Sequence, residues 1–549
     1  MASTEEPTKP TSLFDSSAAQ PLLSGPPEPD RSEVEREHDP TQYLQITYNR
    51  SPRTFRNIAF LIIFVVFVLC TFGFGIFCVF HRNTNYSTVS SYSYSSSSAS
   101  CVKSSNSTSL ALIPDLAAWV SLNSLSSSTV LRDLIWVLVI TLVLSVPICF
   151  LLLLLLKHYV KQIVYVCLPF FILLPVFFDV YWFVACTISS SCSDAFPLVY
   201  RILVLVFVFL VIGVIVWIFV INWHRIELTV SIIGVASDAL SSNLGLFVAL
   251  PCLTIGLVAY YAPIIVFLVF ARHNGKIVPK ESSDGEYSCT WKQDRWVPAY
   301  FALAVLTMLW SLTTMIEAQV YVISGTIAQW YFAKEEHSVP RRSIRSSLRN
   351  AFGPSSGTIC LSGLLIGIVR IVRTAVDTAA REDAPGIVNL VLQCCVNALL
   401  SSIEFLNKFT INFAAITGEA YCTSARMTYE LLKRNLLSAV FVETVSTRLL
   451  GGIVFVFSAI YAIAAWGILK GVTDLGVDSY FLALLAWAAL TLVLGFFIHV
   501  LDNVIDTVYI CYAIDRDRGE VCKQDVHEVY VQLPISRNRA PLASPSIGV

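Results

Sequence analysis

Residues 399–435 read LLSSIEFLNKFTINFAAITGEAYCTSARMTYELLKRN, a stretch that begins as an apolar helix and is then interrupted by polar side chains. Asn407, Lys408 and Asn412 follow Glu404 at offsets of three, four and eight residues, which places all four on one helical face. One charged residue at the centre of a membrane-spanning helix costs about 2.5–3.5 kcal/mol on insertion scales. Such groups therefore face protein or a watery cavity, and this face is a candidate transport path.

A structural explanation of the same face is also open. Glu404 precedes Lys408 by four residues, which is the favourable order for an ion pair within one helix. That pair would neutralise both charges without any solute. It accounts less well for Asn407 and Asn412, which carry no charge to neutralise.

The composition of the whole chain favours a membrane protein. The 549 residues are 55% hydrophobic and only 14% charged, and long apolar segments recur from Ile58 almost to the C-terminus. This distribution predicts an all-α polytopic membrane protein whose surroundings are the lipid bilayer. The formal net charge is −1, and the sequence has no basic stripe of the kind that binds nucleic acid.

The apolar segments predict about ten transmembrane helices, with both termini in the cytosol. Arg50, Arg53 and Arg56 precede the first span, and basic residues near a span favour the cytosolic side. The predicted spans are 58–80, 134–156, 163–187, 200–221, 244–270, 297–323, 356–379, 387–417, 449–469 and 480–513.

The polar segments complete the predicted organisation. Residues 1–57 form a disordered cytosolic tail, because they are polar, rich in Pro and Ser and without periodicity. Residues 58–513 form the membrane transporter domain, and residues 514–549 form a second cytosolic tail. Within the membrane domain, 81–133 is an outer Ser-rich loop and 333–355 is a cytosolic basic loop. Residues 418–448 are too polar to cross the membrane and are predicted to form a loop that contains a helix, and residues 223–243 to lie along the membrane surface.

The outer side carries two kinds of candidate modification. Asn85 and Asn106 each begin a glycosylation sequon in the loop predicted to lie outside. Cys186 and Cys192 close a short loop on the same side and form the preferred disulfide, although Cys101 and Cys289 also lie there. The alternative is that all four thiols are free.

Catalytic chemistry is not indicated by the sequence. No HExxH or Walker loop is present, and no pair of cysteines has the CxxC spacing of a metal or redox site. The chain is therefore not expected to be an enzyme, and no metal or cofactor is predicted.

Carboxylates and aromatic rings within the spans are the stronger signal. Asp179, Glu317, Glu404 and Asp506 fall inside predicted spans or at their edges. Asp502 lies four residues before Asp506 on one helical face, so one of the two must hold a proton or face a cation. Carboxylates in a cavity favour a cationic solute. The alternative is that each is hydrogen-bonded to neighbouring helices.

Aromatic faces are the groups that hold a quaternary ammonium, which has no N–H donor. Trp310 lies near the middle of its span and is the preferred candidate for such a cage. Trp and Tyr side chains near span ends are more often interfacial anchors.

Three stretches resemble the choline transporter-like family, in its shorter fungal and plant branch. They are VISGTIAQWYF at 322–332, the polar helix from Glu404 through GEAYCTSA at 418–425, and DTVYICYAID at 506–515. The resemblance covers roughly residues 230–520. It implies ten helices, cytosolic termini, a large first outer loop and choline uptake that does not need sodium.

The resemblance and the residues together suggest a carrier of choline or a related small organic cation. The alternative is a membrane scaffold, trafficking or choline-lipid homeostasis protein that does not transport. The plasma membrane is the expected location, with an endomembrane such as the trans-Golgi as the alternative. The oligomeric state is not indicated. The candidate path residues are Asp179, Trp310, Glu317, Glu404, Asn407, Asn412 and Asp506.

The predicted topology can be tested by glycosylation and by tag accessibility. Replacing Asn85 and Asn106 by Gln should each remove one glycan from the protein expressed in eukaryotic cells, because both sequons lie on the outer side. An epitope tag inserted in 334–349 should stain only after the cells are permeabilised. Staining of that tag on intact cells would contradict the ten-span topology.

Overall fold

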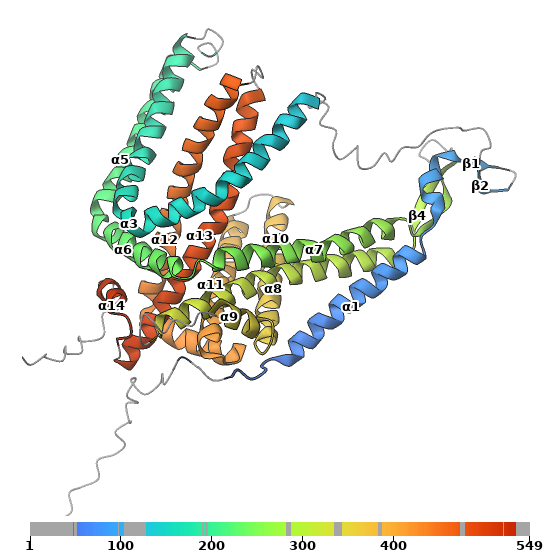
Figure 1. The fold of residues 1–549 in the computed structure, drawn as a ribbon. Helices are drawn as coiled ribbons and strands as arrows, with labels where there is room; N and C mark the ends of the chain where they lie inside the picture. Colours follow the sequence, from blue (N-terminus) through green and yellow to red (C-terminus); the bar gives the residue numbers. More distant parts are fainter. Residues whose placement is uncertain are drawn as a thin grey trace, which may run out of the picture. The chain divides into compact units, whose positions relative to one another are not determined.

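The computed structural model describes residues 48, 52–96, 98–103, 128–188, 192, 196–281, 287–333, 343–382, 387–472, 478–519 and 521–533. Most of the predicted tail 1–57, together with Asn106 and residues 334–342, lies outside the described residues. Its residues 52–57 are described, and they pack against α10 and α11, so the expected disorder does not hold for them. The described chain is almost entirely helical (Figure 1). Its long helices are α1 Ile58–Phe80, α3 Ser128–Ile188, α5 Leu198–Ile221, α6 Trp223–Ser241, α7 Leu246–Arg272, α8 Val297–Tyr331, α10 Ser356–Glu382, α11 Ile387–Thr417, α12 Tyr421–Val472 and α13 Asp478–Arg518.

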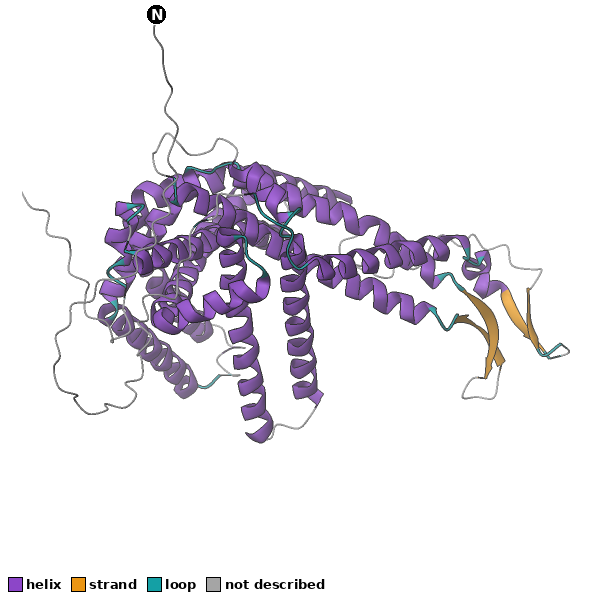
Figure 2. Ribbon diagram, turned by 90° about the horizontal axis from the view of Figure 1, so that it is seen from below, coloured by secondary structure: helices purple, strands orange, loops and turns teal. Residues whose placement is uncertain are grey.

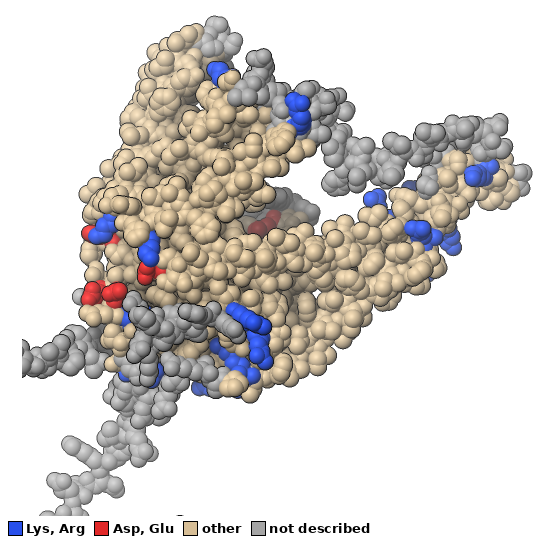
Figure 3. Space-filling view, viewed as in Figure 1, with Lys and Arg blue, Asp and Glu red and all other residues tan. Residues whose placement is uncertain are grey.

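The structure confirms the all-α polytopic membrane fold. Eight helices within the described residues are long and apolar enough to cross a membrane. In Figure 3 most of the visible surface of the long helices carries neither basic nor acidic side chains, as a lipid-facing surface requires. The chain is therefore an integral multi-pass membrane protein.

The eight helices do not correspond one to one with the ten predicted spans. The predicted spans 134–156 and 163–187 are joined in α3, which has non-helical torsion angles at Tyr159. The predicted span 387–417 is the 31-residue helix α11, which is not among the eight. The count of ten stays a prediction.

The helix that contains the predicted ninth span begins earlier than expected. Residues 418–448 were expected to form a loop that contains a helix, but α12 runs without interruption from Tyr421 to Val472. The turn before it is short, and Gly418 adopts a left-handed backbone conformation with φ of 76°, which glycine tolerates best. Charged residues made this segment look like a loop, yet Glu443 points at a lysine of α11.

Residues 223–241 form α6, whose buried side chains pack against α3 and α13. The position of this segment along the membrane surface stays a prediction. Beyond α13, the predicted C-terminal tail includes one more short helix, α14 Gln524–Tyr530, in which Val526 and Tyr530 are buried. A further short helix, α9 Ser343–Ala351, packs against α8.

Two uninterrupted buried segments lie in the core. Every residue is buried from 317 to 328 in α8 and from 500 to 515 in α13. These helices pack against each other and against α11, and α12 lies along α13 (Figure 1). Polar side chains in these two segments must find partners inside the protein, because neither water nor lipid reaches them.

The loops at one end of α1, α7 and α8 carry two small antiparallel hairpins (Figure 2). One pairs β1 Tyr92–Ser95 with β2 Ser100–Lys103, and the other pairs β3 Gly275–Glu281 with β4 Tyr287–Gln293. The 3-10 helix η2 Thr84–Ser91 precedes them and holds Asn85 with its side chain exposed.

Two disulfides join the four cysteines that were expected on the outer side. Cys186 is bonded to Cys192, and Cys101 in β2 is bonded to Cys289 in β4. The second bond ties the two hairpins together across a sequence separation of 188 residues.

The disulfide between the hairpins should protect both of its cysteines from labelling. In Cys101→Ser the partner thiol of Cys289 becomes free, so a membrane-impermeant maleimide should label Cys289, and the stability should fall by about 2–5 kcal/mol. The matched control is Cys252→Ser, which removes an exposed free cysteine from α7. Labelling of Cys289 in the parent protein without reductant would contradict the bond.

Candidate functional site

The polar face of α11 is divided among its neighbouring helices. Glu404 pairs with Arg373 of α10, with 3.1 Å between Oε2 and Nη2. Asn407 faces α10 and α12, and Asn412 faces α8. Lys408 faces carboxylates of α12 and α13 instead of Glu404. The alternative in which Glu404 neutralises Lys408 within the helix is therefore wrong, because other helices supply closer partners.

Lys408 is the centre of a buried charge cluster. Its Nζ lies 2.5 Å from Asp506 Oδ2, 3.0 Å from Asp502 Oδ2 and 3.4 Å from Glu443 Oε1. Thr447 donates a hydrogen bond of 2.8 Å to the other oxygen of Asp502. Asp502 and Asp506 thus face a cation, which was one of the two expectations from their spacing. The cluster fastens α11, α12 and α13 together at one level.

Glu317 is placed differently. It lies on α8 with 7% of its surface exposed, and its Oε2 accepts a hydrogen bond of 3.1 Å from Ser362 of α10. The Ser362 hydroxyl also lies 2.8 Å from Oδ1 of Asn407, which accepts a further bond of 2.7 Å from the hydroxyl of Tyr421. Among the described residues, no Lys, Arg or His forms an ion pair with Glu317. Arg370 of α10 attracts the carboxylate from a distance without pairing with it.

These four residues form what we call the Glu317 network: Glu317, Ser362, Asn407 and Tyr421. Neutral hydroxyl and amide groups surround its carboxylate, although an ionised carboxylate in the protein interior is costly without a paired counter-charge. The arrangement therefore suits either a protonated carboxyl or a positive charge supplied from outside the protein.

A second polar contact joins three helices about two turns further along α8. Ser324 donates a hydrogen bond of 2.7 Å to Oδ1 of Asn412 and accepts one of 3.0 Å from Thr507 of α13. The amide nitrogen of Asn412 is buried and has no hydrogen-bond partner among the described residues. Polar groups thus continue along α8 and α11 from the Glu317 network.

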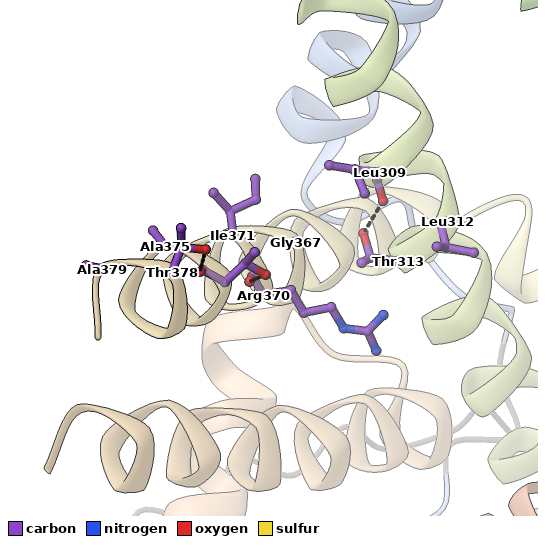
Figure 4. Close-up of a pocket in the computed structure, with 10 residues that line it drawn as sticks. Leu309, Leu312, Thr313, Gly367, Arg370, Ile371, Ala375, Thr378 and Ala379 are labelled. Carbon is purple, nitrogen blue, oxygen red and sulfur yellow. Dashed lines mark hydrogen bonds between the residues drawn. The ribbon is translucent and has the colours of Figure 1, made fainter. Parts of the chain in front are cut away.

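A cavity of about 760 Å³ lies between α8 and α10, and its lining includes none of the four residues of the Glu317 network. Its wall is mainly apolar, and Thr313 in this wall lies one helical turn before Glu317. Arg370 extends from α10 towards α8 and is the one charged member of the lining among the described residues (Figure 4). The full lining is Leu309, Leu312, Thr313, Gly367, Arg370, Ile371, Thr374, Ala375, Thr378 and Ala379.

The structure does not bring Trp310 and Asp179 to this site. The Trp310 indole donates a hydrogen bond of 3.0 Å to the carbonyl of Cys360 and meets the rings of Phe64 and Phe67 edge-on, so it packs in the protein interior. Asp179 lies between α3 and α5, where it lines a separate cavity of about 460 Å³ with Trp182.

Sequence reasoning identified Glu317 and Asn407 but missed the two hydroxyl-bearing members of the network. Ser362 and Tyr421 carry no charge, and hydroxyl groups are common in membrane helices, so nothing in their spacing set them apart. Tyr421 did fall inside a stretch that carried the family resemblance, which was the one available signal.

Comparison with known proteins gives a family match to this part of the chain. A family model described as plasma-membrane choline transporter matches residues 206–517, which include all four residues of the Glu317 network and Lys408. Asp179 lies outside the match.

The chain is also similar to individual choline transporter-like proteins from several organisms. Choline transporter-like protein 3 of Homo sapiens is 24% identical over 312 residues, covering 54% of this chain and 46% of the relative. Choline transporter-like protein 1 of Mus musculus is 25% identical over 301 residues, covering 53% and 45%. A CTL-like protein of Dictyostelium discoideum is 23% identical over 240 residues, covering 41% and 43%. The match thus spans less than half of the length of each of these three relatives.

The Lys408 cluster should be required for folding. Lys408→Met keeps an unbranched side chain one atom shorter but leaves Glu443, Asp502 and Asp506 facing one another without a cation, so the protein should lose about 3–5 kcal/mol of stability. Size-exclusion profiles after heating should show a lower melting temperature and a smaller folded yield.

The matched control for that variant is Lys161→Met. It removes an ion pair with Glu227 in which both side chains are about half exposed. Exposed pairs contribute about 0–1 kcal/mol, so this control should melt like the parent. Equal melting temperatures of Lys408→Met and the parent would contradict the structural role of the cluster.

Proposed function

Because the chain belongs to the choline transporter-like family, we propose that it carries choline or a related small organic cation across a membrane. The family match establishes a membrane transporter-like protein. The solute is proposed from the charges in the part of the chain that the match covers. Sodium independence and the plasma membrane are part of the proposal, and the family resemblance supports both.

Glu317 is the single observation that carries the proposed solute class. Asp502, Asp506 and Glu443 share Lys408, and Glu404 has Arg373. Glu317 is as deeply buried as Asp502 but has only neutral hydrogen-bonding partners among the described residues. A cationic solute would supply the missing paired charge.

The surroundings of Glu317 suit a quaternary ammonium in two further respects. Such a cation cannot donate an N–H hydrogen bond, so it is held by diffuse negative charge, aromatic faces and apolar contacts. The ring of Tyr421 lies in the network, and the cavity between α8 and α10 offers an apolar wall for methyl groups. Arg370 disfavours a cation beside it, so we place the ammonium group beyond Thr313, which lines the cavity one helical turn before Glu317.

The other candidate path residues take supporting roles in this proposal. Asn407 holds Tyr421 and Ser362 in place next to Glu317, and Asn412 continues the polar route toward the far end of α11. Glu404 and Asp506 already have positively charged partners, so their proposed contribution is to hold the helices that border the route.

The proposal is tested by uptake of labelled choline into proteoliposomes that contain only this protein. Glu317→Gln keeps the shape and the hydrogen-bonding capacity of the side chain but removes its charge. The folded yield should hold, whereas the initial uptake rate should fall at least tenfold, which corresponds to about 1.4 kcal/mol of lost attraction.

Glu227→Gln is the matched control, since it changes an exposed glutamate of α6 and should transport at the parental rate. Uptake by Glu317→Gln at the parental rate would remove Glu317 from the path. A parent protein with no uptake above that of empty liposomes would favour the scaffold or lipid-homeostasis alternative instead.

A further inference from the structure

Residues 52–57, which precede α1, contact the start of α10, the end of α11 and Tyr321 within α8, and we call this segment the N-terminal strap. The backbone nitrogen of Arg56 donates a hydrogen bond of 3.1 Å to the carbonyl oxygen of Pro354, in the turn before α10. At Gly357 a Cβ atom would collide with the carbonyl oxygens of Arg56 and Asn57. The strap therefore fits closely against the start of α10.

Arg53 is the residue of the strap that reaches furthest into the protein. Its Nη2 donates a hydrogen bond of 2.5 Å to the carbonyl oxygen of Ala415, and its Nη1 lies 3.5 Å from that of Ala414. Its Nη1 also donates to the hydroxyl of Tyr321, and the guanidinium carbon lies 5.6 Å from the centre of the Tyr321 ring.

The two carbonyls that Arg53 contacts belong to the last turn of α11, which ends at Thr417. The final carbonyls of a helix have no partner within the helix and carry a partial negative charge. The backbone nitrogen of Gly418 donates a hydrogen bond of 2.9 Å to the carbonyl of Ala414, and the guanidinium of Arg53 supplies the donor for the carbonyl of Ala415. Arg53 thus serves as a side-chain cap for α11 and joins it to α8 through Tyr321.

The contact lies directly beyond the proposed cation route. Tyr321 follows Glu317 by one helical turn on the same face of α8, and it donates a hydrogen bond of 2.7 Å to Ser355. Ala415 follows Asn412 by three residues on α11. The strap therefore fastens α8 to α11 at the end of the bundle next to their buried polar side chains.

We propose that Arg53 holds a gate closed at this end of the route between α8 and α11. When the guanidinium leaves the carbonyls of α11 and the Tyr321 hydroxyl, the end of α11 can separate from α8 and the Glu317 network becomes accessible from this side. This proposal rests on the proposed function only for the identity of the solute. The closure by Arg53 does not depend on which solute passes.

Accessibility of a reporter thiol tests the gate without any solute. Ser355→Cys places this thiol at a position that is 4% exposed and contacts the Tyr321 hydroxyl. A membrane-impermeant maleimide is applied to the purified full-length protein, and labelling of the reporter thiol is followed by mass spectrometry of its peptide. With Arg53→Ala added, the rate should rise at least fivefold, and with Arg53→Lys it should rise less, because lysine keeps the charge but not the planar set of donors.

Two controls separate gate opening from general loosening. Arg56→Ala removes an ion pair with Glu419 in which both side chains are more than a third exposed, and it should leave the reporter thiol protected. The native Cys167 is buried in α3, away from the strap, and its labelling should not change in any variant. If Arg53→Ala does not fold, the comparison of Arg53→Lys with Tyr321→Phe carries the test, and both should expose the reporter thiol.

Equal labelling of the reporter thiol with and without the Arg53 changes would overturn the gate. So would a rise in Cys167 labelling that matches the rise at the reporter thiol, because Arg53 would then be a general stabilising residue. The result does not depend on choline: a chain that exposes the reporter thiol on loss of Arg53 but takes up no choline would keep the gate and reject the proposed solute.

Discussion

The structure depends on how a few charges are neutralised inside a helical membrane protein. Lys408 of α11 reaches two carboxylates of α13 and one of α12, and no helix of the three could bury its charge alone. Arg373 and Glu404 do the same for α10 and α11. These contacts determine which faces of the helices meet, since a slip of one turn would leave a charge in the apolar interior.

Glu317 differs from these paired charges. Neutral hydroxyl and amide groups hold its carboxylate in place, and in the described part of the chain it has no ion-pair partner. The same α8 face continues to Tyr321, where Arg53 reaches the end of α11. One helix face thus connects a carboxylate that lacks a paired counter-charge with the contact that closes the route.

Much of this organisation was predictable from the sequence. Long apolar segments need no tertiary information, so the positions of most helices followed from composition alone. The spacing of Asp502 and Asp506 predicted a cation or a proton between them, and Lys408 is that cation. The partner of Lys408 was not predictable, because a pattern within α11 shows which residues share a face but not which helices lie against it.

The remaining differences have similar physical causes. The bond between Cys101 and Cys289 joins segments far apart in the chain, and no local pattern pairs them. The continuity of α12 was missed because charged residues made its first part look like a loop, although one of them, Glu443, is neutralised by Lys408 of α11. Ser362 and Tyr421 were missed because a neutral hydroxyl becomes significant only once its neighbours are known.

The central claim is that Glu317 is neutralised by the solute. Determining the structure of the purified protein by electron cryo-microscopy, with and without saturating choline, tests it most directly. The account predicts added density between α8 and α10, within contact distance of the Glu317 carboxylate and the Tyr421 ring, while the Lys408 cluster stays unchanged. Added density beside Asp179, or at the Lys408 cluster with the surroundings of Glu317 unchanged, would contradict it.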